Sequence, residues 1–287
     1  AEYVSNFIAY LHMARDKGVS IEVIPSGDDG NLCLDILEDM IDENVKLISA
    51  THVPTNSGLV NAIADLGKVA KKHNILYLVD ACQSVGQMPI DVDEIGCDML
   101  SATGRKYLRG PRGVGFLYVR KSVVQKLHPP IVDLRSADWL STSEYKLKPD
   151  ARRFENWESN YAAILGLGAA VDYALDIGLD NIRARNSELA TYLRSRLGEL
   201  DGVHIHAISD QQCAITSFYV DDHVAADIVN SLRAHHINTS VSAPSSTLLD
   251  ANKNKLPNLV RASVHYYNDK GEIDKFIKTL RSLILEK

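Results

Sequence analysis

Residues 103–106, with the sequence TGRK, place a hydroxyl, a glycine, a guanidinium and an amine side by side at the end of an apolar run. Asp80 ends an earlier apolar run, LYLVD. A buried carboxylate needs a cationic or hydrogen-bonding partner, because burying it alone is costly. Parallel strands of an open α/β sheet gather ligands at their carboxyl ends, so Asp80 and Lys106 are predicted to meet at one edge. The plainer alternatives are a helix cap for Asp80 and a solvated charge for Lys106.

Taken together, these groups favour pyridoxal 5'-phosphate (PLP) as a cofactor. Lys106 would form a Schiff base with the aldehyde, and Asp80 would keep the pyridine nitrogen protonated. Thr103 and Arg105 would hold the phosphate. The GPRG that follows does not have the glycine order of a nucleotide phosphate loop, and no GxGxxG follows a first strand. Nucleotide and nicotinamide chemistry are therefore disfavoured.

The elements that must position these residues follow an α/β pattern over residues 1–160. Strands are expected at 21–25, 46–53, 76–82, 98–103 and 115–119, and helices at 33–43 and 60–73. These strands are apolar at successive positions, as in a mostly parallel, mixed sheet covered by helices. Residues 121–160 are less regular and are expected to form a crossing segment.

The second part of the chain, residues 161–287, has a different pattern. Helices are expected at 162–175, 181–200, 224–236 and 272–287, and strands at 203–207, 214–220 and 259–267. This order predicts a smaller C-terminal α+β domain.

The composition excludes several classes of protein. A formal charge of −6 and a pI near 5.9 argue against nucleic-acid binding, which needs a clustered basic surface. Four cysteines without a CxxC pair indicate reduced thiols and neither a disulfide framework nor a metal site. No run is long and apolar enough to span a membrane, so we expect a soluble, cytoplasmic protein.

Five segments in order resemble the class V aminotransferase family of PLP-dependent enzymes. They are EYVSN, ATHVPTNSG, LVDACQSVGQMPIDV, CDMLSATGRKYLRGPRGVGFLYV and RRFENWESNYAAILGLGAAVDYAL, with VRASVHYYN near the end. The family includes cysteine desulfurases, C–S lyases and isopenicillin N epimerase-like proteins. The resemblance implies the PLP-dependent transferase fold of type I.

The resemblance also implies roles for single residues. Lys106 matches the Schiff-base lysine, Asp80 the partner of the pyridine nitrogen, and Gln83 the residue that contacts the phenolic oxygen. Thr103 and Arg105 occupy the phosphate-contacting places, where desulfurases generally have Ser and His.

Three further residues are carried over in the same way. Tyr3 stands where the family often places a histidine that stacks on the cofactor ring, and Arg261 matches the arginine that binds the substrate α-carboxylate. Asn56 is expected on the cofactor side, although the family's asparagine aligns nearer Thr55.

The resemblance leaves the reaction open. The region between Asn238 and Arg261 contains no cysteine, which disfavours a desulfurase that forms an enzyme persulfide. C–S cleavage by β-elimination, epimerisation and transamination remain, and EYVSNF, PTNSGLV and RFENWESNYA look most like the epimerase-like branch. A non-catalytic relative that acts as a binding module is the alternative from another class.

Two expectations concern the assembly. Family members are usually homodimers with the site at the interface, and Glu158 stands near the place of a threonine that reaches the partner's phosphate. The chain begins at Ala1 inside an expected helix, so we expect an upstream segment with a phosphate-binding turn, and weakened cofactor binding without it.

Overall fold

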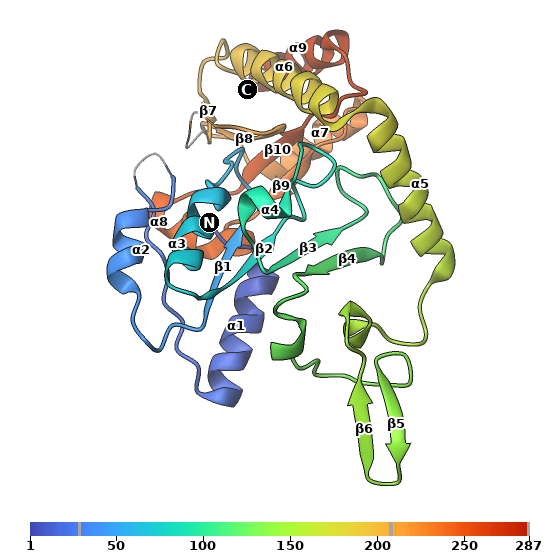
Figure 1. Ribbon diagram of the computed structural model, residues 1–287. Coiled ribbons are helices and arrows are strands. Elements are labelled where there is room, and N and C mark those ends of the chain that lie inside the picture. The colour runs from blue at the N-terminus through green and yellow to red at the C-terminus, as the bar shows by residue number, and fades with distance from the viewer. Residues whose placement is uncertain (28–29, 207–208, 210, 286–287) are drawn as a thin grey trace.

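The computed structural model describes residues 1–285 except 28–29, 207–208 and 210. Two sheets lie one above the other in Figure 1, and the long helices α5 (Tyr161–Ile177) and α6 (Leu179–Leu197) connect them. This arrangement confirms the α/β fold expected from the sequence. The boundary between residues 160 and 161 stays a prediction.

The first sheet contains the strands β1 (Leu47–Thr51), β2 (Leu76–Asp80), β3 (Met99–Thr103) and β4 (Gly115–Val119), in that spatial order. β1, β2 and β3 are parallel, and β4 is antiparallel to β3. The register pairs Thr51 with Asp80 and Asp80 with Ser101. The carboxyl ends of three strands therefore share one edge.

Helices α2 (Leu34–Met40), α3 (Ile63–Lys72) and α4 (Val92–Ile95) pack near this sheet. The buried positions of α3 recur at intervals of three and four, and they are Ile63, Leu66, Val69 and Ala70. This stripe is the one that the sequence predicts, because one face of an amphipathic helix packs on the core. At the N-terminus, α1 (Val4–Lys17) is attached to β1 and β2 through side-chain hydrogen bonds to Ser49 and Asp80.

The second sheet is antiparallel, with the order β7 (Val203–Ile205), β8 (Ile215–Val220), β10 (Leu259–Ser263) and β9 (Ser240–Ser242). Helices α6, α7 (Ala225–Ala234) and α9 (Lys270–Leu285) bury their apolar faces with it in one core. The connection between β9 and β10 contains the short helices η3 (Pro244–Thr247) and α8 (Leu248–Asn254).

The structure differs from the sequence-based expectations in two segments. Residues 21–25 form no strand, and the nearest pairing is an isolated bridge between Ser26 and Leu32. Residues 121–160 are not simply irregular: they contain η1 (Val124–Lys126), the hairpin β5 (Ala137–Ser141) and β6 (Glu144–Leu147), and η2 (Ala151–Phe154). The hairpin projects from the body of the protein (Figure 1), so no buried face gives it a period-two pattern. Residue 207 of the expected strand and residues 286–287 of the expected last helix lie outside the described residues.

Among the described residues, no single helix has the length and apolar character needed to cross a membrane. Helices α5 and α6 meet these criteria only as a pair, and the pair is bent by 78°.

Candidate active site

A cavity of about 320 Å³ opens between the carboxyl edge of the first sheet and β10. Its lining residues come from segments that are far apart in the sequence: Tyr3, Thr55, Gln83, Arg105, Lys106, Tyr107, Arg261, Ser263, His265 and Tyr267. Five of the eight residues expected at the site from sequence line this cavity. The other three are Asp80, Thr103 and Asn56.

Lys106 lies in a tight turn that directly follows β3. The Arg109 backbone NH donates to the Lys106 carbonyl at 2.9 Å, and the Gly110 NH donates to the Gly104 carbonyl at 2.8 Å. The Lys106 amine is 5.8 Å from the centre of the Tyr3 ring. Burial lowers the pKa of Lys106, and the nearby Asp80 partly offsets this effect. A lysine with a lowered pKa is a better nucleophile and base at neutral pH.

Asp80 is the last residue of β2, and both of its carboxylate oxygens accept hydrogen bonds. The Cys82 backbone NH donates to Oδ1 at 2.8 Å, and the Asn6 side-chain amide donates to Oδ2 at 2.8 Å. The carboxylate is therefore held in one orientation near the Lys106 amine. A helix cap, the plainer alternative for Asp80, would not account for the second hydrogen bond, which comes from Asn6 on α1.

Gln83 and Thr55 lie together on the cavity wall, where the Gln83 Nε2 donates to the Thr55 hydroxyl at 2.9 Å. The expectation that Asn56 faces the cofactor is not supported by this geometry. The Asn56 amide is buried and donates to the Ala243 carbonyl at 3.1 Å and to the Thr247 hydroxyl at 3.0 Å. The turn after β1 directs successive side chains to opposite sides, so Thr55 faces the cavity and Asn56 anchors η3.

The cationic groups of the cavity are Arg105 and Arg261, together with Lys106. Burial lowers the pKa of Arg261, and its Nε has no hydrogen-bond partner among the described residues. A buried donor without a partner is costly, so an anion in the cavity would satisfy it. Thr103 ends β3 next to this loop without lining the cavity, and its phosphate contact stays a prediction.

Ser263, His265 and Tyr267 also line the cavity, and they are not among the eight site residues expected from the sequence. Ser263 follows Arg261 by two residues in β10, so the alternation of the strand places these two on one face. His265 and Tyr267 lie after the end of β10, and Tyr267 is in a turn, so their place on the cavity wall does not follow from strand alternation.

The His265 ring is stacked between two tyrosines. Its centroid is 5.1 Å from that of Tyr107 and 4.5 Å from that of Tyr267. Its Nε2 lies 3.2 Å from the Tyr107 carbonyl, and its Nδ1 accepts from the Tyr266 NH at 3.0 Å. Burial lowers the pKa of His265 to about 4, so the ring is neutral at pH 7.

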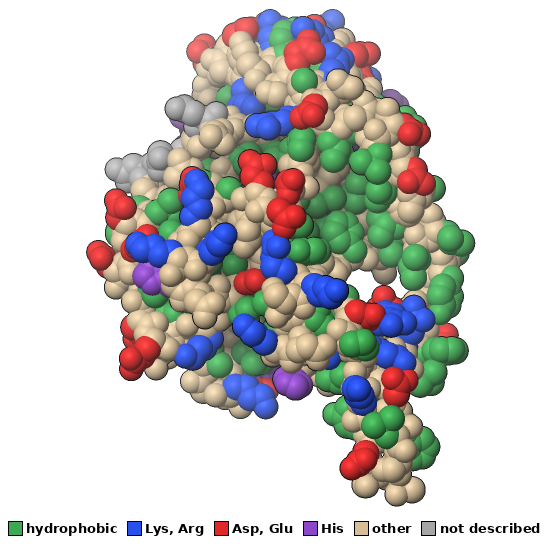
Figure 2. Space-filling view, viewed as in Figure 1, with side chains coloured by type: hydrophobic (Ala, Val, Ile, Leu, Met, Phe, Trp, Pro, Cys, Tyr) green, Lys and Arg blue, Asp and Glu red, His purple; other side chains and the backbone are tan. Residues whose placement is uncertain are grey.

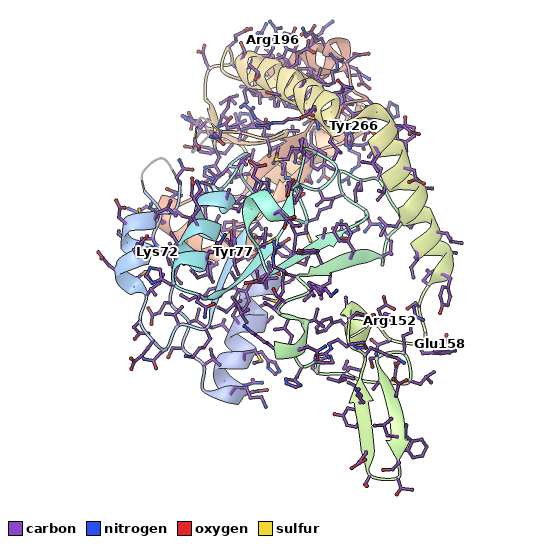
Figure 3. All side chains as sticks on the ribbon, viewed as in Figure 1. Lys72, Tyr77, Arg152, Glu158, Arg196 and Tyr266 are labelled. Carbon is purple, nitrogen blue, oxygen red and sulfur yellow. The ribbon has the colours of Figure 1, made fainter. Side chains whose placement is uncertain are left out.

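A ring of aromatic side chains next to the cavity surrounds Arg109. The guanidinium carbon lies 4.8 Å from the Tyr173 ring centre, 5.0 Å from that of Tyr266 and 5.5 Å from that of Tyr267. Tyr266 lies beside α5 (Figure 3), and Tyr173 belongs to that helix. Arg109 therefore links the lysine turn to α5 and to the chain after β10.

Among the described residues that line the cavity, none is a cysteine. Cys97 and Cys213 are buried, and burial raises the pKa of both thiols. Cys82 is half-buried beside Asp80, and burial raises its pKa to about 12. These three thiols are protonated at neutral pH, and a thiol in that state is a poor nucleophile.

A half-buried lysine at the carboxyl edge of an α/β sheet, with a fixed carboxylate and two arginines around one cavity, is the arrangement expected of a PLP-dependent enzyme of fold type I. The family model described as "Aminotransferase class-V" matches residues 1–276. The chain belongs to the class V aminotransferase family.

Relatives of known name agree with this assignment. The chain is 31% identical over 283 residues to a "Probable cysteine desulfurase" of Halalkalibacterium halodurans, covering 97% of this chain and 68% of the relative. It is 30% identical over 285 residues to one of Methanothermobacter thermautotrophicus, covering 98% of this chain and 71% of the relative.

Two solved structures are also similar. The cysteine desulfurase of Thermococcus onnurineus NA1 superposes with a TM-score of 0.92 and 29% identity, covering 100% of this chain and 71% of that chain. The cystine C–S lyase C-DES, in complex with its product cysteine persulfide, superposes with a TM-score of 0.85 and 26% identity. That match covers 98% of this chain and 73% of C-DES.

The enzymes of this family are PLP-dependent, and the residues of this cavity fit that cofactor. Lys106 would supply a partly desolvated amine for the aldehyde, and Asp80 would supply a fixed carboxylate for the ring nitrogen. Arg105 and the Nε of Arg261, which has no hydrogen-bond partner among the described residues, would supply donors for anionic groups. The individual contacts of these residues with the cofactor stay predictions.

Proposed function

We propose that the protein cleaves the C–S bond of a sulfur-containing amino acid such as cysteine or cystine by PLP-dependent elimination, without an enzyme persulfide. The observation that carries this proposal is a cavity with Lys106 and Arg261 but no thiol on its wall. The relatives named cysteine desulfurase and the similarity to a cystine C–S lyase support the sulfur amino acid as substrate.

Each polar residue of the cavity has a role in this proposal. Arg261 binds the substrate α-carboxylate through its planar fork, which orients the Cα–H bond toward Lys106. When bound, PLP supplies the electron sink that makes the α-proton acidic. The Lys106 amine takes that proton, and the sulfur leaves Cβ with the electrons of the C–S bond. With cysteine, the overall reaction consumes water and gives sulfide, ammonia and pyruvate.

The segment between β9 and β10 contains no cysteine, and it packs against the loop that follows β1. Thr247 is buried and accepts a hydrogen bond from Asn56. A sulfur-carrying segment must move a thiolate to the substrate and away again. The absence of a cysteine in this segment and its packing support elimination over sulfur transfer to the enzyme.

Cysteine desulfuration is the second candidate, and the names of the 30–32% identical relatives favour it. In that reaction cysteine and an enzyme thiol give alanine and an enzyme persulfide. Cys82 is the thiol that affects the Lys106 amine electrostatically, so it would be the acceptor. Epimerisation and transamination stay predictions from the sequence.

The two candidates are separated by their products. The protein is reconstituted with PLP and incubated with cysteine or cystine, and pyruvate, alanine and protein-bound persulfide are quantified. Elimination predicts pyruvate in proportion to released sulfur, no alanine, and no product with the Lys106→Ala variant. Alanine accompanied by a persulfide on Cys82 would contradict the proposal, and so would inversion of the amino acid without sulfur release.

The homodimer expected from the family is also part of the proposal. Large apolar side chains are exposed on the hairpin and on α5, among them Trp139 at 81%, Leu165 at 75% and Tyr161 at 64%. Figure 2 shows hydrophobic side chains along the edge of the molecule that α5 forms and on the hairpin below it. Apolar surface of this extent marks an interaction site. Glu158 lies at the opposite end of α5 from Tyr266 (Figure 3), which supports a place facing a partner subunit and not its own cavity.

Light scattering tests this assembly. Replacement of Trp139 and Leu165 by Glu is expected to halve the native mass. Val224→Glu is the matched control, because Val224 is 59% exposed but directly precedes α7 and belongs to neither the hairpin nor α5. A monomeric mass for the unmodified protein would contradict the dimer.

A further inference from the structure

Asn6, on α1, lies between two carboxylates. Its side-chain nitrogen donates to Asp80 Oδ2 at 2.8 Å and to Glu2 Oε1 at 3.0 Å. An amide NH₂ has two hydrogens, so both are used. The Asn6 side chain is therefore fixed in rotation, and it connects α1 to the end of β2.

Glu2 holds the other end of this cluster. Its Oε1 also accepts from the Tyr3 backbone NH at 2.6 Å and from the Thr51 hydroxyl at 2.5 Å. Thr51 ends β1 and pairs with Asp80 in the sheet register. One hydrogen-bond cluster thus joins the start of α1 to the ends of two neighbouring strands.

This cluster contacts two residues that face the cofactor in the proposed function. Asp80 has one oxygen held by the Cys82 NH and the other by Asn6. The backbone of Tyr3, whose ring lies over the Lys106 amine, is held by Glu2. Hydrogen bonds to ionised groups are stronger than neutral ones and restrict the geometry of the acceptor.

We propose that Asn6 is a positioning residue, which orients the Asp80 carboxylate toward the cofactor's ring nitrogen and, through Glu2, fixes Tyr3 over the ring. This inference rests on the proposed function, because it takes the PLP-binding roles of Asp80 and Tyr3 as given. Asn6 itself does not line the cavity, so it acts only through its neighbours.

Helix α1 offers a matched control for this role. The Tyr10 hydroxyl is 2.7 Å from the Ser49 hydroxyl, and this bond also attaches α1 to the first sheet. Ser49 belongs to β1, whereas the Asp80 carboxylate accepts its hydrogen bonds from Cys82 and Asn6. Tyr10→Phe therefore removes an attachment of the helix without changing the orientation of the carboxylate.

The experiment measures PLP binding to the full chain by tryptophan fluorescence quenching, and the absorbance and circular dichroism of the bound cofactor. Asn6→Ala is expected to weaken PLP binding roughly tenfold and to change both spectra, because one hydrogen bond to a charged group is lost. Asn6→Asp keeps the shape but replaces the donor by a carboxylate, so it should weaken binding at least as much. Tyr10→Phe should keep the wild-type spectra and affinity.

Thermal unfolding without PLP separates positioning from folding. The inference is overturned if Asn6→Asp binds PLP with wild-type affinity and spectra, or if Tyr10→Phe reproduces the effects of Asn6→Ala. It is also overturned if the loss of affinity only parallels the loss of melting temperature. Asp80→Ala tests the proposed function separately. Unchanged PLP binding and spectra in that variant would remove the role of Asp80 itself. A defect in Asp80→Ala with no defect in Asn6→Ala would overturn only the inference about Asn6.

Discussion

Gly86 is the position at which the loop after Asp80 touches the chain after Lys106, and its replacement by Ala tests how this contact supports the site. Gly86 has φ +84°, and an added Cβ would lie 2.5 Å from the Leu108 nitrogen and 2.7 Å from the Tyr107 carbonyl carbon. Both neighbours are backbone atoms, so they cannot move aside as a flexible side chain could. The turn that carries Lys106 would have to shift.

The expected loss of stability has two parts. A left-handed conformation costs a non-glycine residue about 1–2 kcal/mol. Overpacking against a close-packed backbone costs roughly a further 1–3 kcal/mol. Urea unfolding of the Gly86→Ala variant should therefore show a loss of about 2–5 kcal/mol. PLP affinity should fall as well, because the displaced residues directly follow Lys106.

Gly113→Ala is the control for the backbone term. Gly113 has φ +78° in the loop between β3 and β4 that carries Lys106, but an added Cβ would meet nothing within 4 Å. This variant should lose only about 1–2 kcal/mol and keep its PLP affinity. The reasoning is refuted if Gly86→Ala is no less stable than Gly113→Ala, or if it binds PLP as the unmodified protein does.

Three further outcomes are expected. Arg109→Ala should lower the free energy of unfolding in urea by about 1–3 kcal/mol, because the guanidinium lies against the rings of three tyrosines. Equal stability of the variant and the unmodified protein would show that these contacts contribute nothing. Burial lowers the pKa of His265 from 6.5 to about 4, so the contribution of the neutral ring to stability is complete above pH 6.5 and is lost as the pH falls toward 4. The slope of this loss is at most about 1.4 kcal/mol per pH unit. The free energy of unfolding should therefore differ less between pH 7 and pH 5 in His265→Phe than in the unmodified protein, and an equal difference would argue against this pKa. Arg261→Lys should raise KM for the amino acid at least about tenfold by losing the two-point grip on the carboxylate, and an unchanged KM would exclude that contact.

The first sheet could be predicted from the sequence because its strands are short, apolar runs covered by helices. β2 and β4 are found within the expected ranges 76–82 and 115–119. The β5–β6 hairpin could not be predicted in this way, because its side chains are mostly exposed on both faces and show no alternation. The run at 21–25 has strand-like composition, but strand formation needs a hydrogen-bonding partner, which composition does not report.

The meeting of Lys106 and Asp80 at one edge could be predicted because strand topology alone requires it. The cofactor contact of Asn56 stays a prediction that its hydrogen bond to η3 does not favour, since the direction of a side chain in an irregular turn depends on contacts with distant segments. The hydrogen bond between Asn6 and Asp80 joins residues 74 positions apart, and no local pattern encodes it. Ser263 is the exception, because it follows Arg261 by two residues within one strand, and this spacing is visible in the sequence.

The most direct test of the central claim is to reduce the PLP-loaded protein with borohydride and to locate the attached pyridoxyl group by peptide mass spectrometry. The account predicts one modified peptide, with the group on Lys106, and loss of that modification together with the visible absorbance band in Lys106→Ala. Attachment at a different lysine, or labelling that persists in Lys106→Ala, would contradict it.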